Sequence, residues 1–335
     1  MALRIKNTLS SLLVLISATA TSIARGDPIC DFDGDGMSEL PFVQVNENGH
    51  FDWSAFNPRT HQVRAVIGNF GDPSSKLIPG NWFEPNKTVA AIVKPVAGAP
   101  NSRSIWTARS LTYAGGSSVT KHLGRTGDLI IQGGDYDGNG ITDSLILKRT
   151  TGKLGLRVNY FLASYNGNNL GTERLYEALG KPFRDANFFF SPDGIVDHLA
   201  VLRRGPPAHN TVLQLKPFTD TPLAFSIGNL PRDSLGPIPL KQGVGRADLL
   251  LFYSKKGEII QLLVKNLRGK TVYRKGIPGS GFVTVGNYFD DPGHEIALQN
   301  KTYFTLINPK THQMHVVESG LTTQWVSCVS SQTIE

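Results

Sequence analysis

Two short stretches of the chain carry oxygen-bearing side chains at their first, third, fifth and ninth positions. They read Asp31-Phe-Asp33-Gly-Asp35-Gly-Met-Ser-Glu39 and Asp135-Tyr-Asp137-Gly-Asn139-Gly-Ile-Thr-Asp143. Calcium accepts about six to eight oxygen ligands in an adaptable geometry. In a tightly turned loop, the first, third and fifth side chains point inward, and glycines permit the turn. A main-chain carbonyl at the seventh position and an acid at the ninth complete the shell. Both stretches are therefore predicted to bind Ca²⁺.

Each odd-numbered position of the two stretches supplies one predicted ligand. The first set is Asp31, Asp33, Asp35, the Met37 carbonyl and Glu39, and the second is Asp135, Asp137, Asn139, the Ile141 carbonyl and Asp143. An EF-hand would place Glu at the twelfth position, where this chain has Phe42 and Ile146. The alternative for both stretches is an Asx-rich turn that holds no ion.

Two other stretches keep only part of this acidic pattern. The partial sets are Asp193 with Asp197, and Asn287 with Asp291 and Glu295. They are weaker candidates for metal binding. The corresponding stretches that begin at 81 and 240 have no acid at the first, third or fifth position and are expected to be metal-free.

The six stretches recur at a nearly constant interval, and each runs from a polar loop into an apolar strand. They start at 31, 81, 135, 189, 240 and 287, so the intervals are 50, 54, 54, 51 and 47 residues. A second pair of similar segments, Asn57-Pro-Arg-Thr-His61 and Asn308-Pro-Lys-Thr-His312, lies 251 residues apart, close to five periods. Both are expected to be hairpin turns.

Each period holds β-branched and aromatic runs bounded by Gly, Pro and Asn, which is typical of strands. About 50 residues and four strands per repeat is the size of a propeller blade. The sequence therefore predicts an all-β fold: a single β-propeller over 25–335 with six four-stranded blades, or seven as the alternative. A short helix at 170–179 is a weak candidate.

The repeats resemble the FG-GAP and VCBS repeats of integrin-α-like propellers. The acidic loop followed by a strand carries this resemblance, together with lead-ins such as FGDPSSKLIPGNW at 70–82 and LGRTGDLIIQGG at 123–134. It is specific in two repeats and weak in four. The resemblance implies a secreted, calcium-stabilised propeller that serves as a binding or scaffold module. Integrin α-chain propellers have seven blades, so their geometry is not carried over to six repeats.

The N-terminal 24 residues have the layout of a secretory signal. Arg4 and Lys6 precede a short apolar run at 12–18, and small residues offer cleavage after Ala20 or Ala24. Cleavage lowers the net charge from +7 to +5, because Arg4 and Lys6 are the only charges lost. No later segment is apolar enough to form a membrane helix. The protein is expected to be secreted or extracytoplasmic.

The two cysteines, Cys30 and Cys328, lie near the two ends of the mature chain. In an oxidising compartment an even count favours a disulfide. Such a bond requires termini that meet, as they do in closed toroidal folds. Two separate thiols are the alternative.

Three features bear on ligands. The fifth repeat carries a basic group that is either a polyanion-binding patch or a solvated blade edge: Lys255, Lys256, Lys265, Arg268, Lys270, Arg274 and Lys275. Four tryptophans are candidates for sugar stacking, although core packing is their commoner role. Nucleic acid is not expected as a partner of an exported protein.

The chain contains no Gly-x-Ser-x-Gly, HExxH, P-loop or CxxC motif. We therefore expect a non-catalytic binding or adhesion module for carbohydrate or a surface protein. A polysaccharide-active lyase or hydrolase on the same scaffold is the first alternative, since such sites are assembled from separate blades. A structural envelope protein is the second. The sequence does not indicate the oligomeric state.

Overall fold

The computed structural model describes seventeen segments of the 335-residue chain. They are residues 30–83, 87–94, 103–109, 118–125, 129–131, 134–136, 140–149, 156–163, 169–174, 183–189, 198–203, 210–215, 223–231, 233–241, 247–289, 293–329 and 332–333. The predicted signal segment lies outside the described residues, as do Asp137, Asn139, Asp193, Asp197 and Asp291.

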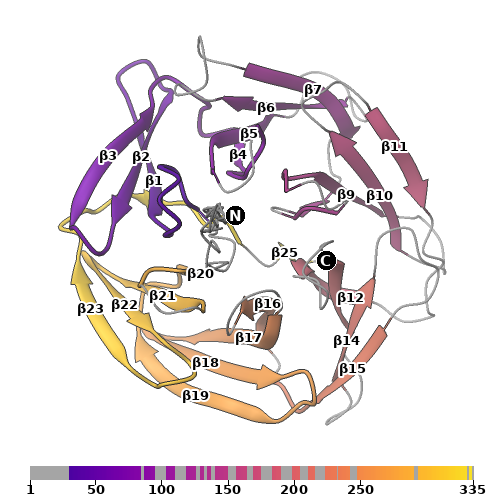
Figure 1. The fold of residues 1–335 in the computed structure, drawn as a ribbon, viewed down its shortest axis with the longest axis vertical. Coiled ribbons are helices and arrows are strands. Elements are labelled where there is room, and N and C mark those ends of the chain that lie inside the picture. Colours follow the sequence, from indigo (N-terminus) through magenta and orange to yellow (C-terminus); the bar gives the residue numbers. More distant parts are fainter. Residues whose placement is uncertain are drawn as a thin grey trace, which may run out of the picture.

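The described strands form six antiparallel sheets arranged in a ring (Figure 1). Two sheets cover the beginning of the chain: β24(Gln324–Trp325), β1(Leu40–Val45), β2(Phe51–Asn57) and β3(Gln62–Ile67), then β4(Lys76–Leu77), β5(Ala90–Lys94), β6(Arg103–Arg109) and β7(Ser118–Arg125). The third and fourth contain β8(Leu129–Ile131), β9(Ser144–Arg149), β10(Leu156–Ala163) and β11(Asn169–Arg174), then β12(Phe183–Phe189), β13(His198–Arg203), β14(Asn210–Leu215) and β15(Leu223–Gly228) with β25(Gln332–Thr333). The last two contain β16(Leu235–Lys241), β17(Ala247–Lys256), β18(Ile259–Asn266) and β19(Thr271–Pro278), then β20(Val283–Gly286), β21(Glu295–Asn300), β22(Tyr303–Ile307) and β23(Met314–Glu318).

Within each sheet the strands follow one another outward from the centre of the ring, as expected for a β-propeller. The predicted all-β propeller fold is confirmed. The helix suggested at 170–179 is wrong over its first half, where β11 pairs with β10. Leu170 and Thr172 lie two residues apart, a spacing that places them on one face of a strand but not of a helix, and pairing with β10 stabilises the strand.

Segments from near the two ends of the described chain meet in the first sheet. Strand β24 pairs with β1 and lies at the inner edge of this sheet, whereas the last strand, β25, pairs with β12 in the fourth sheet. Cys30 and Cys328 form the predicted disulfide, with Cα atoms 5.8 Å apart and a sequence separation of 298. The ring is therefore closed by a strand pairing and by a covalent bond.

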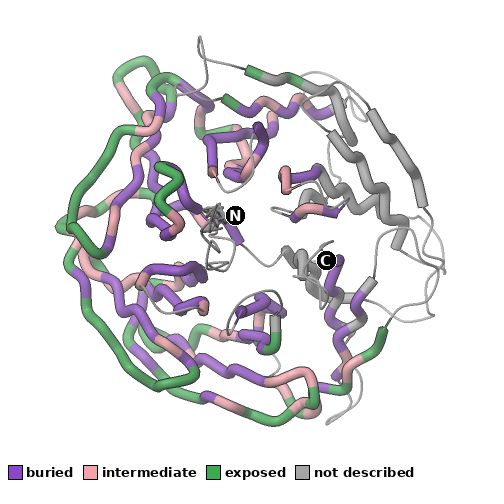
Figure 2. Tube along the Cα trace, viewed as in Figure 1, coloured by how far each residue is buried: buried purple, intermediate pink, exposed green. Residues whose placement is uncertain are grey.

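The core lies between neighbouring sheets. The first and last sheets share an aromatic cluster in which the Trp325 ring packs edge-on against Phe42 and Phe304. The first and second sheets share another cluster that includes Trp53 and Ile92. Inner and middle strands are mostly buried, whereas the outer strands β3, β19 and β23 are largely exposed (Figure 2). Burial on both faces explains why the middle strands read as near-continuous apolar runs.

The two similar turn segments have the same geometry. The Asn57 carbonyl accepts a hydrogen bond from His61 N, and the Asn308 carbonyl accepts one from His312 N, each at 2.9 Å. His61 and His312 both adopt positive φ, at 59° and 64°. These histidines therefore close hairpins, β2–β3 and β22–β23. Within the described residues, no helix is long and apolar enough to cross a membrane.

Candidate metal centre

The 31–39 loop precedes β1 and is folded around the side chain of Asp31. Asp31 Oδ1 accepts a hydrogen bond from Gly34 N at 2.6 Å, and Oδ2 accepts one from Gly36 N at 2.9 Å. Both glycines have positive φ, at 81° and 88°, which side-chain-bearing residues seldom adopt. The glycines predicted to permit the turn therefore do so, and Asp31 is buried at its centre.

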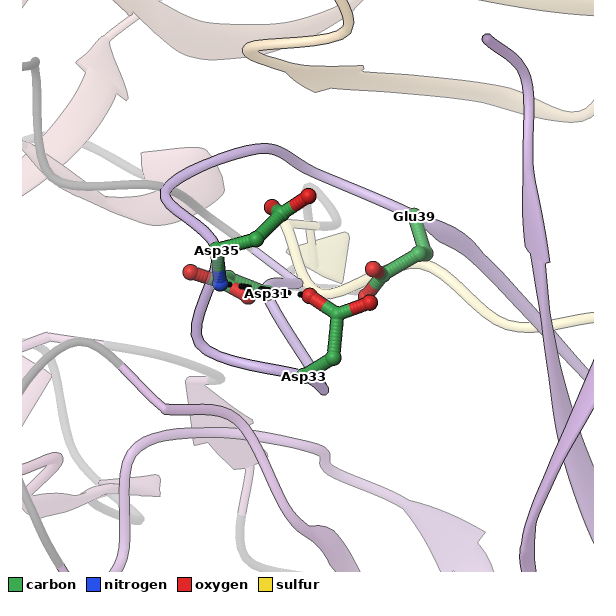
Figure 3. Close-up of side chains that lie close together, drawn as sticks. All are labelled: Asp31, Asp33, Asp35 and Glu39. Carbon is green, nitrogen blue, oxygen red and sulfur yellow. Dashed lines mark hydrogen bonds between the residues drawn. The ribbon is translucent and has the colours of Figure 1, made fainter. Parts of the chain in front are cut away.

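The loop brings all four of its acids together (Figure 3). One oxygen from each of Asp31, Asp33, Asp35 and Glu39 lies within 4.8 Å of the others. Asp33 and Asp35 are exposed, so a cation has access from solvent. The Met37 N–H donates to Asp35 Oδ1 at 2.8 Å, which holds the seventh residue against the fifth. This is a set of hard oxygen donors of the kind that calcium prefers.

Glu39 carries the observation that points most directly to a cation. Its residue is only 2% exposed, and its Oε2 accepts a hydrogen bond from Phe32 N at 2.6 Å. Its other oxygen, Oε1, is buried with no donor group bonded to it, and a side-chain hydrogen bond between Glu39 and Asp33 requires a proton on one of the two carboxyls. A buried carboxylate oxygen that lacks a donor is costly, and a bound cation would satisfy it. The residues present fit Ca²⁺.

The electrostatics of the metal-free loop agree with this fit. Burial raises the pKa of the Asp31 carboxyl to about 6, and the charges of Asp35 and Asp33 add to the effect. Burial also raises the pKa of Glu39 to about 9, with the neighbouring charges of Asp33 and Asp31 contributing. Without a cation, the loop therefore retains a proton at neutral pH.

The 135–143 loop repeats two of these hydrogen bonds at the same spacing. Gly140 N donates to Asp135 Oδ2 at 2.6 Å, and Tyr136 N donates to Asp143 Oδ2 at 2.7 Å. Ile141 is partly exposed in the same loop. Asp137 and Asn139 lie outside the described residues, so the ligand set is seen only at its two ends.

The 287–295 loop keeps the same framework. Tyr288 N donates to Glu295 Oε2 at 2.9 Å, seven residues away, as in the other two loops. Asn287 is buried and its Oδ1 has no hydrogen-bond partner, while its Nδ2 donates to Gly36 O at 3.2 Å. Asp291 lies outside the described residues, and the 189–197 pair Asp193 and Asp197 does too.

Sequence reasoning missed a reciprocal pair of backbone and side-chain hydrogen bonds between neighbouring loops, which we call a clasp. Ser38 N donates to the Asn287 carbonyl at 2.7 Å, and Asn287 N donates to Ser38 Oγ at 2.8 Å. Thr142 and Asn81 repeat the pair at 2.9 and 2.7 Å. In each case the eighth residue of one loop binds the first residue of the loop before it in the ring. The sequence feature that could have revealed this contact is the hydroxyl residue, Ser38 or Thr142, directly before the acid at the ninth position of the loop.

Two further loops make a similar junction through a backbone hydrogen bond. Thr88 N donates to the Asp31 carbonyl at 2.6 Å. His294 N donates to the Lys241 carbonyl at 2.8 Å, and Lys241 N donates to His294 Nδ1 at 3.3 Å. His294 is thus a buried junction residue. The candidate metal loops are built into the contacts between sheets.

The basic residues of the fifth repeat are spread from one end of its sheet to the other. Lys255 and Lys256 lie at the β17–β18 end of the sheet, and Arg268 and Lys270 lie at the opposite, β18–β19 end. Exposed Arg274 and Lys275 lie on the outer strand β19 between them. Lys265 is buried, and its Nζ donates to Gly269 O at 3.1 Å, so it supports a turn.

The four tryptophans are buried in the core. Trp53, Trp82, Trp106 and Trp325 are 1%, 9%, 5% and 8% exposed. Trp53 Nε1 donates to Phe70 O, and the rings of Trp82 and Trp106 pack edge-on. Their predicted core role is confirmed, so they do not form a sugar-stacking platform.

No protein-family model matches the chain, and no curated protein matches it. Solved structures of similar shape include TolB from Acinetobacter baumannii, at 10% identity and TM-score 0.46, with 86% of this chain and 66% of that chain covered. A putative 6-phosphogluconolactonase from Bacteroides uniformis has 12% identity and TM-score 0.45, with 83% and 81% covered. A Trypanosoma rangeli sialidase has 9% identity and TM-score 0.43, with 89% and 54% covered. These likenesses assign no family and no activity.

Proposed function

We propose that this chain is an exported, FG-GAP/VCBS-like β-propeller in which each of the six sheets is one blade. It binds Ca²⁺ in the 31–39 loop and, through the same framework, in the 135–143 loop. It acts as a non-catalytic binding module for carbohydrate or a surface protein.

The observation that carries the calcium proposal is the state of Glu39. Its carboxylate is buried beside three aspartates, and Oε1 has no donor group bonded to it. Burial removes the Glu39 carboxylate from solvent and the neighbouring carboxylates repel it, which is why the pKa of Glu39 is raised to about 9. A divalent cation removes both costs at once. Asp33 and Asp35, exposed at the mouth of the cluster, give it a path of entry.

The same contacts favour a structural role for these acids over a catalytic one. A raised pKa is what a general acid needs, but Glu39 Oε2 accepts the Phe32 N–H and the residue is 2% exposed. Both oxygens of Asp31 accept backbone N–H groups of their own loop. The acids therefore hold the loop and the ion. Saturable binding of a ligand elsewhere on the rigid ring is compatible with this structural role of the acids.

Calorimetric titration of the purified chain with CaCl₂ tests the metal site. Asp33→Ala is the informative variant, because Asp33 is exposed and the backbone hydrogen bond that it accepts from Asp35 N is long, at 3.2 Å. Glu47→Ala is the matched control, since it removes an exposed acid outside the loop. We expect Asp33→Ala to lose one binding event and Glu47→Ala to lose none. Equal titrations for all three proteins would exclude the 31–39 loop as a site.

A glycan array probed in calcium and again in EGTA tests the binding role. The proposal expects saturable, calcium-dependent retention of a glycan that remains intact after prolonged incubation. Shortened or unsaturated sugar products would instead establish the polysaccharide-active alternative.

A further inference from the structure

Cys30 connects the candidate calcium loop to the C-terminal segment. It directly precedes Asp31, and its carbonyl accepts a hydrogen bond from Glu39 N at 2.9 Å. One residue thus holds the first and ninth positions of the loop together. Its side chain is joined to Cys328. The disulfide and the loop therefore share a backbone segment.

Cys30 also adopts a backbone conformation that needs support. Its φ is 65°, in the left-handed region. For a residue other than glycine this conformation is strained, and it persists where surrounding contacts enforce it. Two restraints do so here: the bond from Glu39 N and the disulfide. Breaking the disulfide removes one of them and favours relaxation of Cys30.

The other half of the disulfide is firmly attached to the ring. Val326 N donates to Pro41 O at 2.9 Å, directly after β24 pairs with β1. Ser327 Oγ bonds Thr284 Oγ1 on β20 at 2.9 Å. Cys328 is buried. Through it, Cys30 is fixed relative to β1 and to β20 of the last sheet.

We propose that the Cys30–Cys328 disulfide sets the calcium affinity of the 31–39 loop, so that reduction weakens cation binding. This rests on the proposed calcium function of that loop. With Cys30 held, Asp31 and Glu39 are pre-positioned; with Cys30 relaxed, binding must also order them. By linkage, calcium must make the disulfide harder to reduce by the same factor.

The redox step is a thiol–disulfide exchange with an external dithiol. Its first thiolate attacks one cysteine sulfur, which forms a mixed disulfide and releases the other cysteine as a thiolate. Its second thiol then displaces the remaining cysteine. Two electrons pass to the protein, each cysteine sulfur gains a proton, and the reductant leaves as a disulfide.

The test measures the calcium affinity of the 31–39 loop in both redox states. It uses the Asp135→Ala variant, so that the 135–143 loop does not contribute to the measured binding. We expect the dissociation constant to be at least tenfold higher after dithiol reduction, and Cys328→Ser to match the reduced protein. Affinities that agree within twofold would overturn the redox coupling and leave calcium binding intact. No binding in either state would overturn the proposed calcium function, and the coupling with it.

A second measurement needs no variant. The unmodified chain is equilibrated in dithiol buffers of graded potential, with and without calcium, and free thiols are counted after alkylation by mass spectrometry. The inference expects calcium to shift the reduction equilibrium constant at least tenfold toward the disulfide. Superimposable curves would contradict it.

Discussion

Ser38 and Asn287, 249 residues apart in sequence, bind each other through two hydrogen bonds. The Ser38 N–H donates to the Asn287 carbonyl, and the Asn287 N–H donates to the Ser38 hydroxyl. Ser38 lies directly before Glu39, so the contact between the first and last sheets is continuous with the candidate calcium loop. If the loop binds calcium as proposed, the ion would stabilise the closure of the ring.

Removing the Ser38 hydroxyl should destabilise the fold. Ser38→Ala leaves the buried Asn287 N–H without its acceptor, which costs about 1–3 kcal/mol of unfolding free energy. Urea unfolding measures the change. Ser226→Ala is the control, because Ser226 is exposed on β15 and its substitution should fall within about 0.5 kcal/mol of the wild type. Equal effects of the two variants would show that the clasp contributes nothing to stability.

Gly80 should not tolerate a side chain. A Cβ at Gly80 would lie 2.8 Å from Thr142 Oγ1 and 2.9 Å from Thr142 Cγ2, at the second clasp. Gly80→Ala is expected to lose about 1–3 kcal/mol by overpacking. Thr142→Ala, which removes both atoms, should relieve that penalty, so a double-mutant cycle should show favourable coupling. Strictly additive losses would contradict this account of the contact.

The stability of the calcium-free protein should fall as pH rises. The folded-state pKa values of Asp31 and Glu39 are raised, to about 6 and about 9. Their protonated forms are favoured in the fold, so the stability they contribute is full below their unfolded pKa values, near 3.8 and 4.5, and is lost as pH rises to about 9. Melting temperatures in EGTA between pH 5 and pH 9 check this.

Calcium should change that pH dependence. Because the ion displaces the retained proton, its affinity should rise by up to about tenfold per pH unit between pH 6 and pH 9. The control is Glu39→Gln, whose EGTA melting temperature should depend less on pH. A wild-type affinity that is flat over this range would show that no carboxyl of the loop holds a proton.

Features that depend on local spacing were predictable from the sequence. Alternating acids and glycines predicted the turn around Asp31, and the 47–54-residue interval predicted sheets of uniform size. Contacts between repeats were not predictable in this way. The role of Ser38 depends on Asn287 lying beside it in the closed ring, and nothing in either local pattern specifies that neighbour. Tertiary position also determined the role of Lys265. Its positive charge suggested that it binds a polyanion, but it lies near the end of β18, where its Nζ donates a hydrogen bond to the Gly269 carbonyl.

The most direct test of the account is thermal unfolding of the oxidised chain with calcium and with EGTA. A ligand at one hundred times its dissociation constant adds about 2.7 kcal/mol, so we expect the melting temperature to rise by roughly 5 °C or more. Asp33→Ala should lose part of this rise, Asp33→Ala with Asp135→Ala should lose nearly all of it, and Glu47→Ala should keep it. A wild-type melting temperature unaffected by calcium, or an unchanged rise in the double variant, would contradict the calcium sites.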